Sequence, residues 1–248
     1  MRVPYCKFCV GAVVIHTSVS ALRTSAARWT SWVTATMSSS SLEGKLFIYS
    51  RKKRLAAFQS GCHHKRYAVF VPGLTDGLLS VDYVPALAEV LERLGFSFVT
   101  PVLSSSYQGY GTSSLRQDVE ELDELLSHIT GRGTTEGRGD VLLIGHSTGC
   151  QDAVAYMREG SQILRGRVCG VVLQAPVSDR ESRAMHPGTA DMVELARSMA
   201  PGDLMPREAE EVPITAQRYL SLTARGGDDD MFSSDLTPRE LSHRIGHM

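Results

Sequence analysis

The sequence predicts an α/β fold in which a mostly parallel sheet is flanked by helices. Apolar runs alternate with segments of helical spacing from about residue 67 to residue 174. The runs are nearly continuous, which is typical of parallel strands covered on both faces. One run ends in Gly145-His-Ser-Thr-Gly149 and passes directly into a helical pattern. These three observations favour a single α/β domain over an all-helical or all-strand one.

The individual elements follow from periodicity and from start and stop signals. Strands are expected at residues 45–50, 55–59, 67–72, 96–103, 140–145 and 168–174, and helices at 82–94, 115–129 and 150–159. Thr237-Pro-Arg-Glu240 predicts a capping box that opens a helix reaching Ile245. The acids of the 115–129 helix are interpreted as a solvated face. Residues 180–248 are expected to be helical and loop-like.

Chain length, net charge and the length of the apolar runs exclude several classes of protein. A chain of 248 residues can hold one domain with a substantial core, or one domain and a tail. The net charge of −1 argues against nucleic acid or an acidic membrane surface as a partner. The longest apolar candidate, residues 8–15, is far shorter than the ~18 residues that a membrane span needs. No cofactor is implied.

The cysteines indicate a reducing compartment, so we expect a cytoplasmic protein. There are five of them, scattered along the chain and odd in number: Cys6, Cys9, Cys62, Cys150 and Cys169. Cys6 and Cys9 with the Cys62-His63-His64 run would be a zinc site only across a long separation, whereas structural zinc sites use two tight ligand pairs. We therefore predict no metal.

Residues 1–42 differ from the rest of the chain. They are basic and rich in Ser, Thr and Ala, and they contain no acid before Glu43. An organelle transit peptide, directing the chain to a plastid or mitochondrion, is one interpretation. A secretory signal is a second, and a true start at Met37 is a third. Each of them excludes this extension from the fold and leaves residues 43–248 as the domain.

The Gly145–Gly149 run carries the candidate chemistry. A serine hydroxyl needs exposure and activation to act as a nucleophile. Glycines two before and two after Ser147 permit a tight strand-to-helix turn that lifts its side chain above the sheet. The Thr148 N–H would then be one oxyanion donor, and the Leu74 N–H, in the loop after an earlier strand, would be the second. His146 is interpreted as a packing residue.

Longer stretches carry a family resemblance. They are "FVPGLTDGLLSVDYVPALAEVLERLGFSFVTPVLSSSYQGYGTSSLRQDVEELDELL", "GHSTGCQD", "LQAPVSDRE" and "ARGGDDDMFSSDLTPRELSHRIGHM". Over about residues 66–248 the chain resembles a branch of the α/β-hydrolase superfamily that includes fungal siderophore esterases. The resemblance implies the α/β-hydrolase fold, Ser147 as nucleophile and hydrolysis of an ester.

The remaining members of a catalytic triad are harder to find. In α/β-hydrolases an acid and then a histidine follow the serine, and the resemblance implies strands beyond Met248 that would carry them. We therefore expect residues 43–248 to be an incomplete domain without its C-terminal strands. Asp179 is the candidate acid within the chain. The candidate bases are His186, His243 and His247, and none of them follows a predicted strand. Asp228 to Asp230 are interpreted as a solvated loop or cap.

Two hypotheses about function remain open. The first is a serine esterase acting on a small-molecule ester, with weak or no activity in this form. The second is a non-catalytic protein of hydrolase fold that binds a small molecule or a partner. The sequence does not specify the substrate or the oligomeric state.

Overall fold

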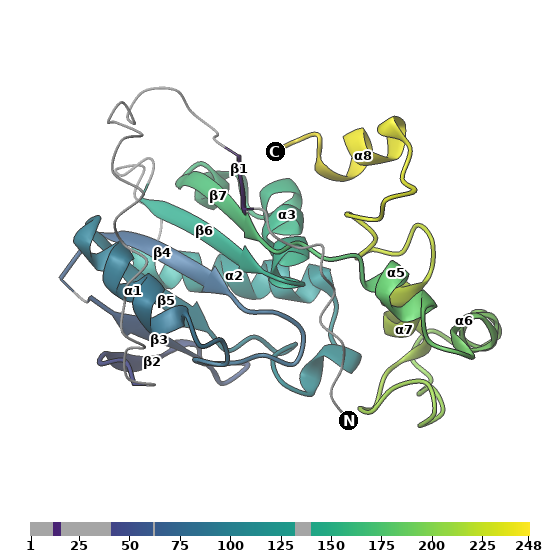
Figure 1. Cartoon of the computed structure of the whole chain (residues 1–248). Helices are drawn as coiled ribbons and strands as arrows, with labels where there is room; N and C mark the ends of the chain where they lie inside the picture. Colours follow the sequence, from purple (N-terminus) through teal and green to yellow (C-terminus); the bar gives the residue numbers. More distant parts are fainter. Residues whose placement is uncertain (1–11, 16–40, 62, 132–139) are drawn as a thin grey trace.

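The computed structural model describes residues 12–15, 41–61, 63–131 and 140–248. Its centre is a seven-stranded sheet of order β1-β7-β6-β4-β5-β3-β2 (Figure 1). Strands β5, β4, β6 and β7 are parallel, β3 and β2 extend one edge antiparallel, and β1 pairs antiparallel with β7 at the other edge. The strands are β1 (Ala12–Ile15), β2 (Lys45–Ser50), β3 (Leu55–Ser60), β4 (Arg66–Val71), β5 (Phe96–Pro101), β6 (Val141–His146) and β7 (Val168–Gln174).

Helices cover both faces of the sheet, and the alternation of side chains along β4 shows how. Ala68 and Phe70 point to one face and pack with apolar residues of α1. Val69 and Val71 point to the other face and belong to the larger cluster with α2 and α3. The helices that cover the sheet are α1 (Val84–Arg93), α2 (Leu115–Thr130) and α3 (Gly149–Glu159), and the short α4 (Gln162–Arg165) precedes β7.

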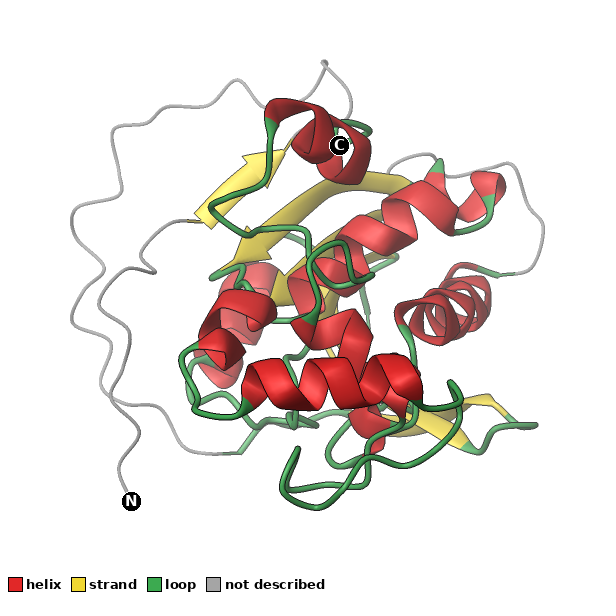
Figure 2. Ribbon diagram, turned by 90° about the vertical axis from the view of Figure 1, so that its right-hand side faces the viewer, coloured by secondary structure: helices red, strands yellow, loops and turns green. Residues whose placement is uncertain are grey.

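The chain after β7, which we call the C-terminal segment (residues 175–248), lies beyond the carboxyl ends of β6 and β7 (Figures 1 and 2). Ile214, Tyr219 and Leu222 of this segment are buried in a small apolar cluster, which Tyr110 joins from the chain before α2. Its helices are α5 (Asp179–Ala184), α6 (Thr189–Ser198), α7 (Ala216–Thr223) and α8 (Pro238–Ile245). No helix within the described ranges is long and apolar enough to cross a bilayer.

The predicted fold class is confirmed, since the described strands form a mostly parallel sheet with helices on both faces. The capping box at Thr237 is present, and the helix that it opens ends at Ile245. Within the 1–42 extension, Ala12–Ile15 form β1 on the edge of β7. The other residues up to 40 lie outside the described ranges, as does most of the predicted 131–139 loop. The division at residue 42 stays a prediction.

The interpretation of the α2 acids as a solvated face is wrong for two of them. Asp118 is 2% exposed and Glu121 is fully buried. Glu121 accepts hydrogen bonds from the backbone N–H and the hydroxyl of Ser104, both at 2.7 Å, and lies 3.3 Å from the Lys53 ammonium. A buried carboxylate is tolerated because these partners replace its water shell.

The interpretation of Asp228 to Asp230 as a solvated loop or cap is likewise wrong for two of the three residues, since only Asp228 is exposed. Asp229 is 2% exposed and Asp230 is 3% exposed. Asp229 pairs with Arg218 of α7 at 2.6 Å, and Asp230 pairs with Arg180 of α5 at 3.0 Å. These aspartates therefore hold the C-terminal segment together instead of facing solvent.

Candidate active site

Ser147 occupies a strained turn between β6 and α3. Its φ of +52° lies in the left-handed region, which is unfavourable for a residue other than glycine. Crowding explains the glycines on either side. A Cβ atom on Gly145 would lie 2.4 Å from the Gly149 carbonyl oxygen, and one on Gly149 would lie 2.2 Å from the Val71 carbonyl oxygen. The turn is held from β7, because the Ser147 N–H donates to the Gln174 carbonyl at 3.0 Å.

The loop after β4 lies against this serine. A Cβ atom on Gly73 would lie 2.9 Å from the Ser147 Cβ. The loop is closed by Asp76, which accepts from the Gly73 N–H at 3.2 Å and donates its own N–H to the Gly73 carbonyl at 3.1 Å. Leu74 is the residue after Gly73 in this loop. Within the described ranges, neither the Leu74 N–H nor the Thr148 N–H donates a hydrogen bond. Their role as an oxyanion hole stays a prediction.

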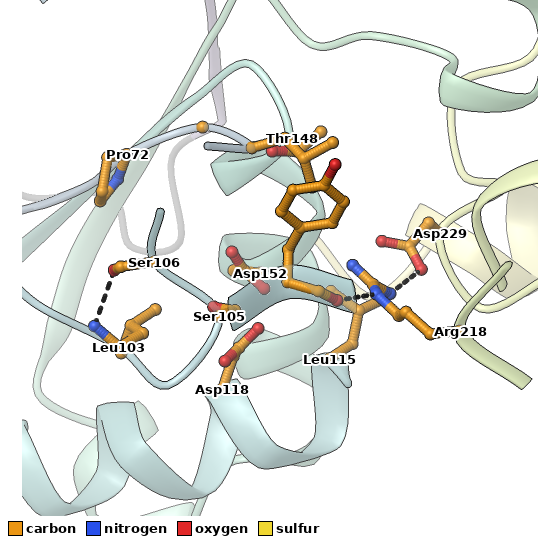
Figure 3. Close-up of a pocket in the computed structure, with 13 residues that line it drawn as sticks. Pro72, Leu103, Ser105, Ser106, Leu115, Asp118, Thr148, Asp152, Arg218 and Asp229 are labelled. Atoms are coloured by element: carbon orange, nitrogen blue, oxygen red, sulfur yellow. Dashed lines mark hydrogen bonds and ion pairs between the residues drawn. The ribbon is translucent and has the colours of Figure 1, made fainter. Parts of the chain in front are cut away.

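Leu74 and Thr148 line a small cavity beneath the turn (Figure 3). Its volume of about 20 Å³ suits a single water molecule. Asp118 of α2 and Asp152 of α3 point toward each other across this space (Figure 3). Arg218 enters from α7 and donates to Asp229 at 2.6 Å and to the Tyr110 carbonyl at 3.0 Å. The cavity therefore joins the core helices to the C-terminal segment.

Burial raises the pKa values of the two carboxyl groups that face each other across this cavity. Desolvation raises the pKa of Asp118 to about 7, although a hydrogen bond from Ser105 and the charge of Arg218 oppose the rise. Burial also raises the pKa of Asp152, and the charges of Asp118 and Asp229 add to the effect. One oxygen of Asp152, Oδ1, is buried without a hydrogen-bond partner. The pair therefore retains a proton near neutral pH.

A larger pocket of about 730 Å³ opens within the C-terminal segment. Leu74 lines it as well as the small cavity, so the pocket reaches the loop beside Ser147. Six of its fifteen lining residues carry charge, with both signs present, and Arg183 and Glu210 form an ion pair there. Its charged and titratable lining residues are Asp179, Arg183, His186, Arg207, Glu208, Glu210, Glu211 and Tyr219.

Asp179 begins α5 at the edge of this larger pocket. Its Oδ2 atom accepts from the Gln151 side-chain amide at 3.0 Å. Burial and the nearby charge of Asp229 raise its pKa to about 7, against the opposing charges of Arg183 and Arg218. The described contacts of this carboxyl group include no histidine. Its role as triad acid stays a prediction.

Among the described residues, the Ser147 hydroxyl has no hydrogen-bond partner, and the histidines there have other surroundings. His146 packs beneath the turn, with Nδ1 2.9 Å from the Tyr83 hydroxyl and its ring stacked 6.1 Å from Phe70. His247 contacts the Val154 carbonyl of α3 at 3.0 Å, and His243 is exposed on α8. His186 lines the larger pocket.

Sequence reasoning missed Arg218, Asp152 and Asp229, which meet at the small cavity. One signal was available for Asp152, because it lies in "GCQDAVAYM", a helical stretch too apolar to face solvent. A carboxyl group there has to be buried and needs a partner. Nothing in the local pattern around Arg218 distinguishes it from an exposed arginine.

The fold and the strained serine between β6 and α3 define an α/β-hydrolase, and known structures agree. The siderophore hydrolase EstB from Aspergillus fumigatus superposes with a TM-score of 0.66 at 28% identity, over 84% of this chain and 73% of that one. A family model described as "Protein of unknown function (DUF1749)" matches residues 37–248. The chain belongs to this DUF1749 family.

Relatives with curated names are consistent with this assignment. The UPF0613 protein PB24D3.06c of Schizosaccharomyces pombe is 36% identical over 194 residues, which cover 73% of this chain and 61% of the relative. The fusarinine C esterase sidJ of Aspergillus fumigatus is 29% identical over 227 residues, covering 72% and 64%. The chain thus spans less than two thirds of the length of these relatives.

Proposed function

We propose that this protein is a serine hydrolase that cleaves a carboxylic ester through Ser147. The observation that carries the proposal is the left-handed backbone of Ser147, held between two glycines that cannot carry a Cβ atom. Five other non-glycine residues of the described chain also have a positive φ, but only Ser147 combines it with a hydroxyl at a strand-to-helix turn. The names of the relatives, an esterase and a siderophore hydrolase, support the same reaction class.

In the proposed mechanism the Ser147 hydroxyl attacks the ester carbonyl and forms a tetrahedral oxyanion. The Leu74 and Thr148 N–H groups stabilise this charge, each by about 3 kcal/mol of barrier. A histidine has to take the serine proton, and His186 is the candidate of this chain because it shares a pocket with Leu74 and Asp179. Loss of such a base costs roughly 10²–10⁴ in rate.

The charged residues in the wall of the larger pocket favour a polar ester over one with a long aliphatic chain. Four carboxyl groups and two arginines line it, so a substrate bearing hydrogen-bond donors or positive charge is better matched than an alkyl chain. Fusarinine C, which appears in the name of the Aspergillus fumigatus relative, is the first compound to test.

A second candidate function is non-catalytic binding of a small molecule in the same pocket. One observation favours it: within the described ranges the Ser147 hydroxyl has no histidine partner. On this hypothesis the strained serine is a remnant of an ancestral enzyme, and the pocket alone is in use.

Labelling with a fluorophosphonate probe separates the two candidates. We expect the 248-residue chain to be labelled, Ser147→Ala to lose the label and Ser182→Ala to keep it, since Ser182 lines the larger pocket without the strained turn. His186→Ala should then slow labelling and ester hydrolysis, whereas His243→Ala should not. A chain that is folded by circular dichroism yet takes no label would mean that Ser147 is not activated within these 248 residues, and would favour the binding protein.

A further inference from the structure

Three side chains with metal-ligating atoms converge at the end of the sheet opposite Ser147. His63 and His64 lie in the turn between β3 and β4, and Glu92 lies in the last turn of α1. One ligand atom from each of the three residues falls within 4.8 Å of the other two. This cluster precedes the first residue of β4, whereas Ser147 follows the carboxyl end of β6. It is therefore separate from the candidate active site.

The turn that carries the histidines is fixed by β5. The buried Ser97 hydroxyl donates to the Gly61 carbonyl and, at 3.2 Å, to the His64 carbonyl. The His64 N–H donates to the Gly61 carbonyl at 3.4 Å, and Gly61 has a φ of +62°, which glycine adopts without strain. The backbone under both imidazoles is thus positioned before any ligand binds, which lowers the entropic cost of binding.

The three side chains already face one another. His63 Nε2 lies 3.6 Å from a Glu92 carboxylate oxygen, and the two imidazole ring centroids are 3.9 Å apart. The Nε2 atom of His64 is withdrawn from solvent and has no hydrogen-bond partner among the residues that the structure describes. A buried imidazole nitrogen without a partner carries a desolvation cost, and a bound cation would remove it.

Among the described residues, no lysine or arginine forms an ion pair with Glu92. Arg93 pairs with Glu89 at 4.0 Å, and the Arg66 guanidinium lies 4.0 Å over the Phe96 ring. The Glu92 carboxylate, with 43% of its side chain exposed, is therefore left to the histidines and to solvent. Two imidazoles and one carboxylate form a ligand set with a net charge of −1, which suits a divalent cation.

We infer that His63, His64 and Glu92 bind one Zn²⁺ ion, which cross-links the β3–β4 turn to α1. Zinc accepts imidazole nitrogen and carboxylate oxygen at about 2.0–2.2 Å, so its ligand atoms lie about 3.4 Å apart in a tetrahedral site. The 3.6 Å separation of His63 and Glu92 is near that value, and small side-chain rotations close the remainder. Water takes the fourth position, because His63 and Glu92 both reach the surface. The role is structural and does not depend on the proposed hydrolase activity.

Zinc titration of the purified chain tests this site. The protein is stripped with EDTA, desalted and titrated with Zn²⁺ by calorimetry, and Co²⁺ absorption in the visible range reports the ligand geometry. We expect one ion per chain and a raised Tm. His63→Ala, His64→Ala and Glu92→Gln should each weaken binding by at least about tenfold, since even residues that only orient a ligand contribute that much. Glu89→Gln, on the same helix, is the matched control and should bind like the unaltered chain.

A second background removes the competing thiols. Cys6, Cys9 and Cys62 lie outside the described residues, and thiolates also bind zinc. The chain with these three cysteines changed to serine should bind one Zn²⁺ with unchanged affinity. Loss of binding in that background would overturn the inference, because the ligands would then be thiolates. Absence of saturable binding by the folded chain, or Glu92→Gln binding like the control, would overturn it equally.

Discussion

The sheet with its helices and the C-terminal segment are stabilised by different interactions. Between the sheet and α2 and α3, fully buried side chains such as Leu122 and Tyr156 form a continuous apolar cluster. The C-terminal segment has a smaller apolar cluster, and its loops are fastened by buried ion pairs, of which Arg218–Asp229 is the least exposed. The stability that comes from apolar burial changes little with pH and salt. A buried ion pair, in contrast, becomes strongly destabilising when one partner is lost, because the other charge stays buried without compensation. The larger pocket therefore lies in the part of the molecule whose stability depends more on pH and on intact ion pairs.

The largest expected effect comes from breaking that ion pair. Asp229→Ala leaves the Arg218 charge buried without its partner, so we expect the free energy of unfolding to fall by about 3–5 kcal/mol. Native-state hydrogen exchange should show the loss first in α7 and last in β6. The measurement is urea denaturation together with exchange at neutral pH.

A double substitution makes this comparison sharper. Replacing Arg218 by Met and Asp229 by Leu removes both charges, and most of the lost stability should return. In the core, Leu122→Ala should cost about 2–5 kcal/mol through the cavity that it leaves. An equal loss in the single and double variants of the ion pair would show that shape, and not charge, holds the segment.

An effect of similar size, spread over about three pH units, should appear in the dependence of stability on pH. The pKa of Asp118 is raised by burial to about 7, above its unfolded value near 4. The folded chain therefore binds more protons than the unfolded one between these values, and stability falls as pH rises from about 4 to about 7, by up to about 1.4 kcal/mol per pH unit for each such group.

Asp118→Asn removes this contribution, so its stability should decline less steeply across that range. Urea denaturation at pH 5, 6, 7 and 8 gives the two slopes. The exposed Asp82→Asn serves as the control and should follow the unaltered chain. Parallel curves for Asp118→Asn and the unaltered chain would mean that the buried carboxyl group is ionised throughout.

The smallest effect is expected for a surface pair in the same C-terminal segment. Arg197 and Glu194 approach to 2.7 Å on α6, but their side chains are 53% and 71% exposed. Arg197→Gln should change the free energy of unfolding by less than about 0.5 kcal/mol, and less still at high salt. A loss comparable with that of Asp229→Ala would contradict the view that burial, and not charge alone, matters in this segment.

The sequence was informative wherever a local pattern determines structure. The apolar runs located the strands from β2 to β7, and Thr237 with Glu240 located the start of α8, because capping depends on residues three apart. The glycines around Ser147 indicated a tight turn. The structure adds the reason, which is close approach of the backbones of β4 and α3.

The local sequence pattern did not predict which charged residues are buried. Glu121 looks like its neighbour Glu120, and only the fold brings Ser104 and Lys53 to it. Arg218 meets the Tyr110 carbonyl across 108 positions of the chain. Glu92 likewise joins His63 and His64 only through the packing of α1 beside the β3–β4 turn. Periodicity reports the face of an element, but not the distant partner that makes a buried charge acceptable.

The positive φ of Ser147 has a consequence for selection. In that conformation glycine is more stable than serine by an amount of the order of 1 kcal/mol. A lineage that no longer needed the hydroxyl would therefore gain stability from a single substitution. Serine at position 147 thus costs this chain stability that glycine would restore, and an ester-cleaving hydroxyl is a use that would offset the cost.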